Sequence, residues 1–340
     1  MKKRLVFLSV ALMVCFLSTG VAGAAPMPKS VNIGTHRVGS LTNVNGTALA
    51  SVINKHSQIN PKVKAVAGPT TWLPMMLTKE MDFGIFTSAD AYPAYLGQGA
   101  YEKLSGGKGF PIRLAFKTMI LNLAMVVPGD SPAKSIPDLK GMRVTGRFPN
   151  VPSAHIATTA ALANGGLTWK DVKMVPVPSP GGALKAVMEG RADAAWGSLG
   201  MPAVREMSAK KGARFLSFDT SAEAMARKDK FHPYSFPTLV KGGKIPGAAV
   251  DTWFIAVENY GACRADIPDD VVYEMNKTLW DNLKEYWSFH RILRSLNEKS
   301  FASAKLFIPY HPGAIRFLKE KGLWSDQLEA RQNELLGMKK

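Results

Sequence analysis

Short apolar runs alternate with stretches of helical periodicity over the first two thirds of the chain. Apolar runs bounded by turn residues are typical of buried strands, whereas apolar positions three and four residues apart are typical of helices. Strands that alternate with helices pair in parallel through right-handed crossovers, so the pattern indicates βαβαβ units. The first unit is predicted from strands at 31–34, 63–67 and 82–86 and helices at 47–56, 72–79 and 91–96.

A second unit with the same alternation comes after a long apolar run at 112–127. That run ends at Pro128-Gly129 and is predicted to form strands that cross between two lobes. Ser135-Ile136-Pro137-Asp138 then resembles a capping box that opens a one-turn helix ending at Gly141. The second unit is predicted from strands at 142–145, 172–177, 192–196 and 214–218 and helices at 153–163, 182–189 and 202–211.

The last part of the chain has a helical pattern. Pro268-Asp269-Asp270 places negative charge in the first turn of a helix whose apolar face continues to Tyr286, and a further helix is predicted over 312–321. No Gly/Ser-rich linker divides the chain, so we expect its domains to interleave. Lobe 1 is predicted at approximately 25–120 plus 245–340, and lobe 2 at approximately 121–244.

The ends of the two units repeat one pattern of residue types. Residues 79–88 align with residues 189–198, and each segment has a helix end, an Asp, a short apolar strand and a Ser. The two Asp residues are Asp82 and Asp193. No fixed short period accompanies this similarity, which excludes a solenoid.

Residues 1–24 have the three parts of a secretory signal peptide. Basic residues at 2–4 precede an apolar stretch at 5–17, and Ala22-Gly23-Ala24 forms a small-residue cleavage signal. The apolar stretch is too short to span a bilayer comfortably. Its removal would leave Cys263 as the one cysteine, which excludes an intramolecular disulfide. We therefore expect a periplasmic protein.

Composition and charge narrow the classes of function. Of the 340 residues, 46% are hydrophobic and 20% are charged, which suits a globular core and excludes a disordered or collagen-like chain. The formal net charge is +17 and falls to +14 without the three basic residues at 2–4. Because the basic residues are dispersed, nucleic-acid binding is not expected. The charge favours anionic ligands or a membrane surface, and a solvated basic surface with no role is the alternative.

Polar side chains gather where the predicted strands end. Ligands of open α/β sheets bind beyond the carboxyl ends of the strands, and backbone N–H groups and Arg side chains there favour a carboxylate. Hydroxyls before helices are commonly N-caps, and tryptophans commonly pack in cores, so each candidate has a structural alternative. The candidates are Thr35, His36, Arg37, Ser40, Thr70, Thr71, Trp72, Thr87, Ser88, Arg147, Ser153, His155, Trp196 and Ser198. We expect Arg37 or Arg147 to pair with the anion.

The sequence contains no recognisable catalytic or metal-binding constellation. None of the six His forms an H-x-H or HExxH spacing, and GxSxG, P-loop and GxGxxG motifs are absent. His36 and His155 could meet across a cleft as a metal pair. We nevertheless expect no metal, no cofactor and no catalytic residue.

Six segments carry a resemblance to a known family through their order and spacing. They resemble the TAXI branch of TRAP-transporter solute receptors, within the periplasmic binding proteins, from about Val31 to about Leu323. The segments are IGT at 33–35, SIPDLKGMRV at 135–144, GGLT at 165–168, AVMEGRADA at 186–194, DIPDDVVY at 266–273 and HPGAI at 311–315.

The resemblance implies an α/β fold with two lobes, each a doubly wound and mainly parallel sheet, around a ligand cleft. It implies that the lobes close on a small, carboxylate-bearing solute and deliver it to a TRAP-type membrane permease. The alternatives are a binding protein of another importer class, a ligand sensor for a membrane kinase, and an enzyme on a similar two-lobed fold. The first loop departs from the family because His36 and Arg37 stand where Gly and Ser are usual, so the family's ligand chemistry does not carry over.

Overall fold

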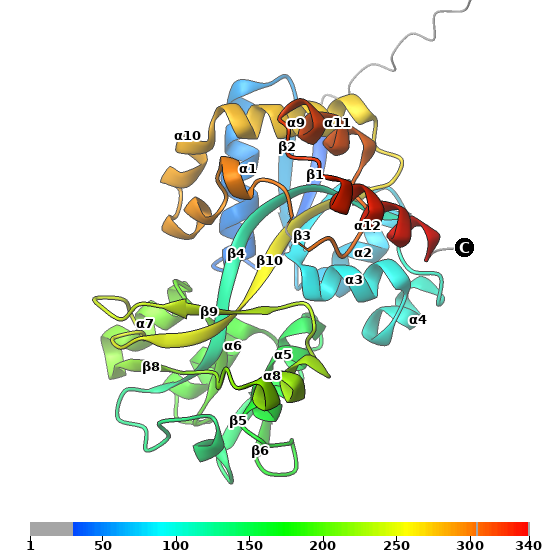
Figure 1. Cartoon of the computed structure of the whole chain (residues 1–340). Coiled ribbons are helices and arrows are strands. Elements are labelled where there is room, and N and C mark those ends of the chain that lie inside the picture. Colours follow the sequence, from blue (N-terminus) through cyan, green and yellow to red (C-terminus); the bar gives the residue numbers. More distant parts are fainter. Residues whose placement is uncertain (1–29, 304, 339–340) are drawn as a thin grey trace, which may run out of the picture.

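Eight strands form one mixed sheet that continues through two lobes (Figure 1). The computed structural model describes residues 30–303 and 305–338, so the signal peptide predicted at 1–24 lies outside the described residues. The strand order is β2-β1-β3-β10-β4-β7, with β9 beside β10 and β8 beside β4. These strands are β1 (Ser30–Thr35), β2 (Asn60–Ala65), β3 (Phe83–Thr87), β4 (Ile112–Pro128), β7 (Ala195–Ser198), β8 (Ala213–Leu216), β9 (Phe236–Val240) and β10 (Thr252–Arg264).

The first lobe contains the first predicted βαβαβ unit. β1 pairs in parallel with β2 and with β3, and the helices are α1 (Leu41–His56), α2 (Pro69–Leu77) and α3 (Ser88–Leu96). α1 begins at Leu41 rather than at residue 47, because the Ser40 Oγ accepts a hydrogen bond from the Asn43 backbone N–H at 3.1 Å and caps the helix.

The C-terminal helices belong to this first lobe, which also contains α4 (Glu102–Ser105) (Figure 1). The helical face predicted from Val271 to Tyr286 is divided at Asn282 into two helices. The helices are α9 (Asp269–Asp281), α10 (Leu283–Ser288), α11 (Pro312–Glu320) and α12 (Asp326–Gly337).

The second lobe contains the second predicted unit. β5 (Arg143–Gly146) and β6 (Lys173–Pro176) pair in parallel, and a single parallel bridge between Val144 and Ala194 joins them to the chain that enters β7. The helices are α5 (Pro152–Asn164), α6 (Pro180–Met188), α7 (Pro202–Lys211) and α8 (Ala222–Asp229). The α/β class is confirmed, but the main sheet is mixed rather than mainly parallel, because β7 and β8 pair antiparallel with β4 where it arrives from the first lobe.

Two long strands cross between the lobes (Figure 1). β4 forms over 112–128, close to the run predicted to cross, and it pairs antiparallel with β10. The sequence interpretation did not anticipate β10, because Glu258 and Asn259 interrupt its apolar pattern. Its register shifts between Glu258 and Tyr260, and again between Gly261 and Ala262.

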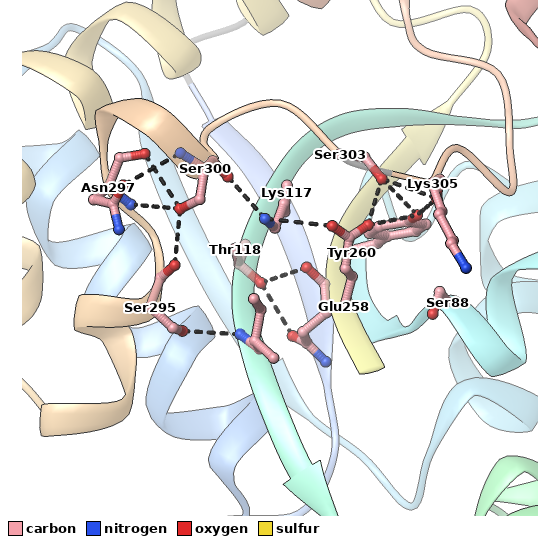
Figure 2. A network of polar contacts seen from close by, with 12 residues as sticks. Ser88, Lys117, Thr118, Glu258, Tyr260, Ser295, Asn297, Ser300, Ser303 and Lys305 are labelled. Atoms are coloured by element: carbon pink, nitrogen blue, oxygen red, sulfur yellow. Dashed lines mark hydrogen bonds and ion pairs between the residues drawn. The ribbon is translucent and has the colours of Figure 1, made fainter. Parts of the chain in front are cut away.

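Figure 2 shows a buried polar network at the first-lobe end of these crossing strands. The Lys117 Nζ on β4 lies 3.3 Å from the Glu258 Oε1 on β10, and it donates to the Ser300 carbonyl at 2.8 Å. Glu258 also accepts hydrogen bonds from the Tyr260 hydroxyl at 3.1 Å and from the Ser303 hydroxyl. Loss of one partner of a buried ion pair leaves an uncompensated charge. The network therefore joins both crossing strands to the C-terminal segment of the first lobe.

Candidate functional site

A cavity of about 90 Å³ lies between the two lobes and against the crossing strands. Leu121, Leu123 and Val257 of β4 and β10 form its floor, and Trp196 and Met201 of the second lobe add further apolar surface. Among the described residues, no Lys, Arg, Asp or Glu lines this inner cavity. Its polar lining consists of His36, Ser40, Thr42, Thr87, Ser153, Ser198 and His232.

Strand ends and helix starts place the hydroxyl groups of the inner cavity. Ser40 caps α1, Thr87 ends β3, Ser153 lies in the first turn of α5, and Ser198 ends β7. These polar side chains therefore gather at the strand ends, and both lobes contribute to the cavity that they line. The predicted residues that the structure brings together here are His36, Ser40, Thr87, Ser153, Trp196 and Ser198.

Each lobe contributes one imidazole to the inner cavity. Burial lowers the pKa of His36, in the first lobe, to about 4. Burial also lowers the pKa of His232, in the second lobe, to about 4, with a smaller contribution from the charge of Lys228. Both imidazoles are therefore neutral at pH 7. The His36 Nε2 is buried and has no hydrogen-bond partner among the described residues.

Asp90 lies directly behind the cavity wall and connects the two lobes. It belongs to α3 in the first lobe and is 1% exposed. Its carboxylate accepts hydrogen bonds from the Ser153 N–H at 3.0 Å, from the Ser153 hydroxyl at 2.5 Å and from the Tyr101 hydroxyl at 2.7 Å. Burial raises the pKa of Asp90, and these hydrogen bonds oppose the increase. Sequence reasoning missed this residue, although an acidic side chain in the apolar segment after a strand end is a usable signal.

An outer groove of about 320 Å³ adjoins the inner cavity and shares His36 and Ser40 with it. Arg37 lines this outer groove and is exposed. Ser179 and Glu206 lie on the opposite, second-lobe side. The structure therefore places the Arg37 guanidinium at the mouth of the cleft and not beside the inner cavity.

Arg147 and His155 lie together on the second lobe but do not line the inner cavity. Arg147 is exposed and has a φ of +72°, and its backbone N–H donates to the His155 Nδ1 at 3.3 Å. The His155 ring stacks on Trp169 with centroids 5.1 Å apart. The structure does not bring His155 and His36 together as metal ligands. Among the described residues there is no group of three or more His, Cys, Asp or Glu that could hold a metal ion.

Trp72 is a core residue rather than a lining residue. It is fully buried against Gly34 of β1 and Gly84 of β3, where an added Cβ would lie 2.8 Å and 2.2 Å from the indole. Thr70 and Thr71 lie in the first turn of α2 outside the inner cavity.

Thr35 and Ser88 are also buried away from the inner cavity. The Thr35 hydroxyl donates to the His36 carbonyl at 3.0 Å, and the Ser88 hydroxyl donates to the Tyr234 carbonyl at 3.5 Å.

Within the described part of the chain, no helix is long and apolar enough to cross a membrane.

Solved structures of other proteins are similar to this chain. PhnD1 of Prochlorococcus marinus, in complex with methylphosphonate, has a TM-score of 0.52 at 13% identity, over 87% of this chain and 100% of that chain. The periplasmic aliphatic sulphonate binding protein SsuA of Escherichia coli has a TM-score of 0.46 at 15% identity, over 90% of this chain and 83% of that chain. The chain therefore shares the fold of PhnD1. The model of the NMT1-like family matches residues 33–322, and the chain belongs to this family.

Proposed function

We propose that the chain is a periplasmic solute-binding receptor that closes its two lobes around a small solute and delivers it to a membrane permease. The observation that carries this proposal is the inner cavity, whose lining comes from both lobes and from the crossing strands. A solute can shift an equilibrium toward closure only if it binds the closed form more tightly. A cavity lined by both lobes meets that requirement, because its full set of contacts exists only in the closed form.

The size and lining of the inner cavity favour a small solute that is partly apolar. A water takes up about 30 Å³ in the liquid, so a cavity of about 90 Å³ accepts roughly three water-sized groups. Apolar side chains with a few hydrogen-bonding groups are typical of ligand sites. We propose binding without catalysis, so that the bound solute leaves chemically unchanged.

The solute expected from the sequence bears a carboxylate. Within this proposal its anionic group lies in the outer groove, where Arg37 is exposed, because no cationic side chain of the described residues lines the inner cavity. Arg147 is less suited to this role because it lines neither space. A charged hydrogen bond contributes about 1.5–3 kcal/mol, so Arg37→Ala should weaken binding of such a solute roughly tenfold or more.

We propose a TRAP-type permease as the partner, on the strength of the six segments that resemble the TAXI receptors. An importer of another class and a membrane kinase that senses the closed receptor are the alternatives. Uptake into vesicles that contain the cognate permease distinguishes the importers. An ion gradient should suffice for a TRAP-type permease, whereas a requirement for ATP would contradict this partner.

A thermal-shift screen tests the proposed function. The mature chain is heated with organic acids, amino acids and uncharged metabolites, because a solute that binds only the folded state raises the melting temperature. A concentration-dependent shift with one solute class supports the receptor function. No shift with any class, together with no bound solute in native mass spectrometry, would contradict it.

A further inference from the structure

The hydrogen bonds of Asp90 determine what one wall of the inner cavity can offer to a solute. A hydroxyl group has one hydrogen to donate and two lone pairs to accept with. The Ser153 hydroxyl donates its hydrogen to the Asp90 carboxylate at 2.5 Å. Ser153 also lines the inner cavity. Its oxygen can therefore act toward a solute only as an acceptor.

Two other hydroxyls of the lining make only long contacts with acceptors of the protein. The Thr87 hydroxyl makes a longer contact of 3.5 Å to Asp90, and the Ser198 hydroxyl donates to the Leu199 carbonyl at 3.4 Å. Ser40 and Thr42 share one hydrogen bond of 3.0 Å, so that pair keeps one hydroxyl hydrogen for the cavity. Among these hydroxyls Ser153 thus has the shortest donation to a protein acceptor, and its side of the wall presents an oxygen acceptor to a solute.

The N-terminus of α5 is already occupied by this carboxylate. A helix N-terminus attracts anions because its first N–H groups have no partner within the helix. The α5 N-cap residue, Val151, provides no side-chain acceptor, and Asp90 accepts from the Ser153 N–H in its place. A carboxylate of a solute cannot use that N–H group while Asp90 holds it.

A second, independent group also requires a partner. The His36 Nε2 is buried without a hydrogen-bond partner among the described residues, and His36 lines the inner cavity. A buried polar atom without a partner costs free energy that a hydrogen-bonding solute recovers. His36 therefore also favours a polar group on the solute.

We propose that the inner cavity binds an uncharged, hydrogen-bond-donating group of the solute, such as a primary amide, and that Asp90 sets this preference through Ser153. The inference rests on the solute-binding function proposed above. At the Ser153 side of the wall a carboxylate would face a lone pair with no cationic side chain beside it, so its burial there would be unfavourable. An ammonium would be buried without an ionic partner, since Asp90 does not line the cavity and already accepts hydrogen bonds from its neighbours. Asp90 is a positioning residue because it acts through Ser153.

Two probes with the same carbon skeleton test the preference in the wild-type chain. Butyramide and butyrate differ only in the polar head, and their dissociation constants are measured by calorimetry. Butyramide can donate a hydrogen bond to Ser153, whereas butyrate meets the Ser153 oxygen with a repulsive contact. This difference corresponds to about tenfold in affinity, so butyramide should bind at least about ten times more tightly than butyrate. Because butyrate could bind at Arg37 instead, the pair is also measured in Arg37→Ala, where the preference for butyramide should be equal or larger.

Asp90→Asn tests the role of Asp90. An Asn side chain donates from its Nδ2, so one hydroxyl partner must accept from it and can turn its own hydrogen toward the cavity. The ratio of the butyrate dissociation constant to the butyramide dissociation constant should therefore fall by a factor of about three or more. Asp138→Asn is the matched control, because Asp138 accepts from the N–H and the hydroxyl of Ser135 in the same way at an exposed position of the one-turn helix Pro137–Leu139. It should leave the ratio unchanged.

Ser153→Ala keeps the inference testable if Asp90→Asn does not fold. It removes the acceptor and should weaken butyramide binding about fivefold or more while affecting butyrate less.

Several results would overturn the inference. The first is that butyrate binds the wild type as tightly as butyramide or more tightly. The second is that butyramide does not bind. The third is that Asp90→Asn has the same ratio of butyrate to butyramide dissociation constants as the wild type. The thermal-shift screen then shows whether the receptor function fails as well, because it includes both charged and uncharged solutes. A solute that binds with the opposite preference overturns only the inference.

Discussion

The two lobes contain the same backbone arrangement but use it for different chemistry. In the first lobe the Asp82 carboxylate accepts from the Asn32 N–H at 2.8 Å, and the Asp82 N–H donates back to the Asn32 carbonyl. In the second lobe Asp193 makes the same exchange with Arg143, also at 2.8 Å. The repeated pattern of Asp, short strand and Ser in the sequence thus corresponds to a repeated way of tying a strand to its neighbour.

The lobes differ in the segments that lie beyond the repeated strand. After β3 the chain enters α3, which brings the buried Asp90 to the interface between the lobes. After β7 the chain turns through Leu199 and Gly200, and this lobe contributes Trp196 and the N-terminus of α5 instead. The common arrangement thus builds the sheet edge in both lobes. The few residues beyond each strand determine which side chains reach the cavity.

The largest effect on stability is expected where the crossing strands enter the first lobe. Lys117→Met removes the ammonium group that lies 3.3 Å from the buried Glu258 Oε1 and should lower the free energy of unfolding by about 3–5 kcal/mol. Lys62→Met, at an exposed position of β2, should change it by less than about 0.5 kcal/mol. Urea unfolding of both variants provides the measurement, and similar values for the two would contradict a role for the buried pair.

The two neutral imidazoles should make the folded chain sensitive to acid. Because burial lowers the folded-state pKa of His232 to about 4, the unfolded chain binds more protons as the pH falls from about 6.5 to 4. Stability is therefore lost over that range, by about 3 kcal/mol for this group. His232→Gln should flatten the acid limb of the unfolding free energy against pH, and His36→Gln should do so to a similar extent.

The raised pKa of Asp90 acts in the opposite direction, because acidification removes a buried charge. The His variants are therefore compared with the wild type at each pH rather than interpreted from a single curve. An acid limb that is unchanged in His232→Gln would contradict this account of the second-lobe imidazole.

The two repeated Asp residues should differ in energetic importance. Asp82→Asn removes a partner of Arg264, whose side chain is 14% exposed, and should cost about 2 kcal/mol. Asp193→Asn acts on Arg143, whose side chain is 44% exposed, and should cost about 1 kcal/mol or less because water replaces much of the interaction. Thermal unfolding of the pair measures the difference. A larger loss for Asp193→Asn would reverse this ranking of the lobes.

Gly68→Ala should have the smallest effect on stability and act mainly on closure. A Cβ at Gly68 of the first lobe would lie 2.0 Å from the Asn150 carbonyl oxygen of the second lobe, so the lobes could not approach as closely. The solute found in the screen should bind roughly tenfold more weakly, because the closed form becomes less accessible. Calorimetry measures the affinity and small-angle scattering the separation of the lobes; unchanged values of both would contradict contact between these segments.

The sequence predicted the alternating elements and the gathering of polar side chains at strand ends, since both depend on local patterns. β10 was missed because its polar residues are paired only within the folded network around Glu258. Asp90 was missed because its partner Ser153 lies far along the chain in the other lobe. Trp72 is a site candidate by sequence because the sequence does not reveal that Gly34 and Gly84 admit its ring into the core.

Blocking the inner cavity tests most directly the claim that the solute is held between the lobes. Ala157 is 2% exposed on α5 and lines this cavity, so Ala157→Leu fills part of it, whereas Ala226→Leu adds the same atoms at an exposed position on α8. Calorimetric titration with the solute found in the screen should give affinity reduced at least about tenfold for Ala157→Leu and unchanged for Ala226→Leu. Wild-type affinity in a folded Ala157→Leu variant would contradict the account.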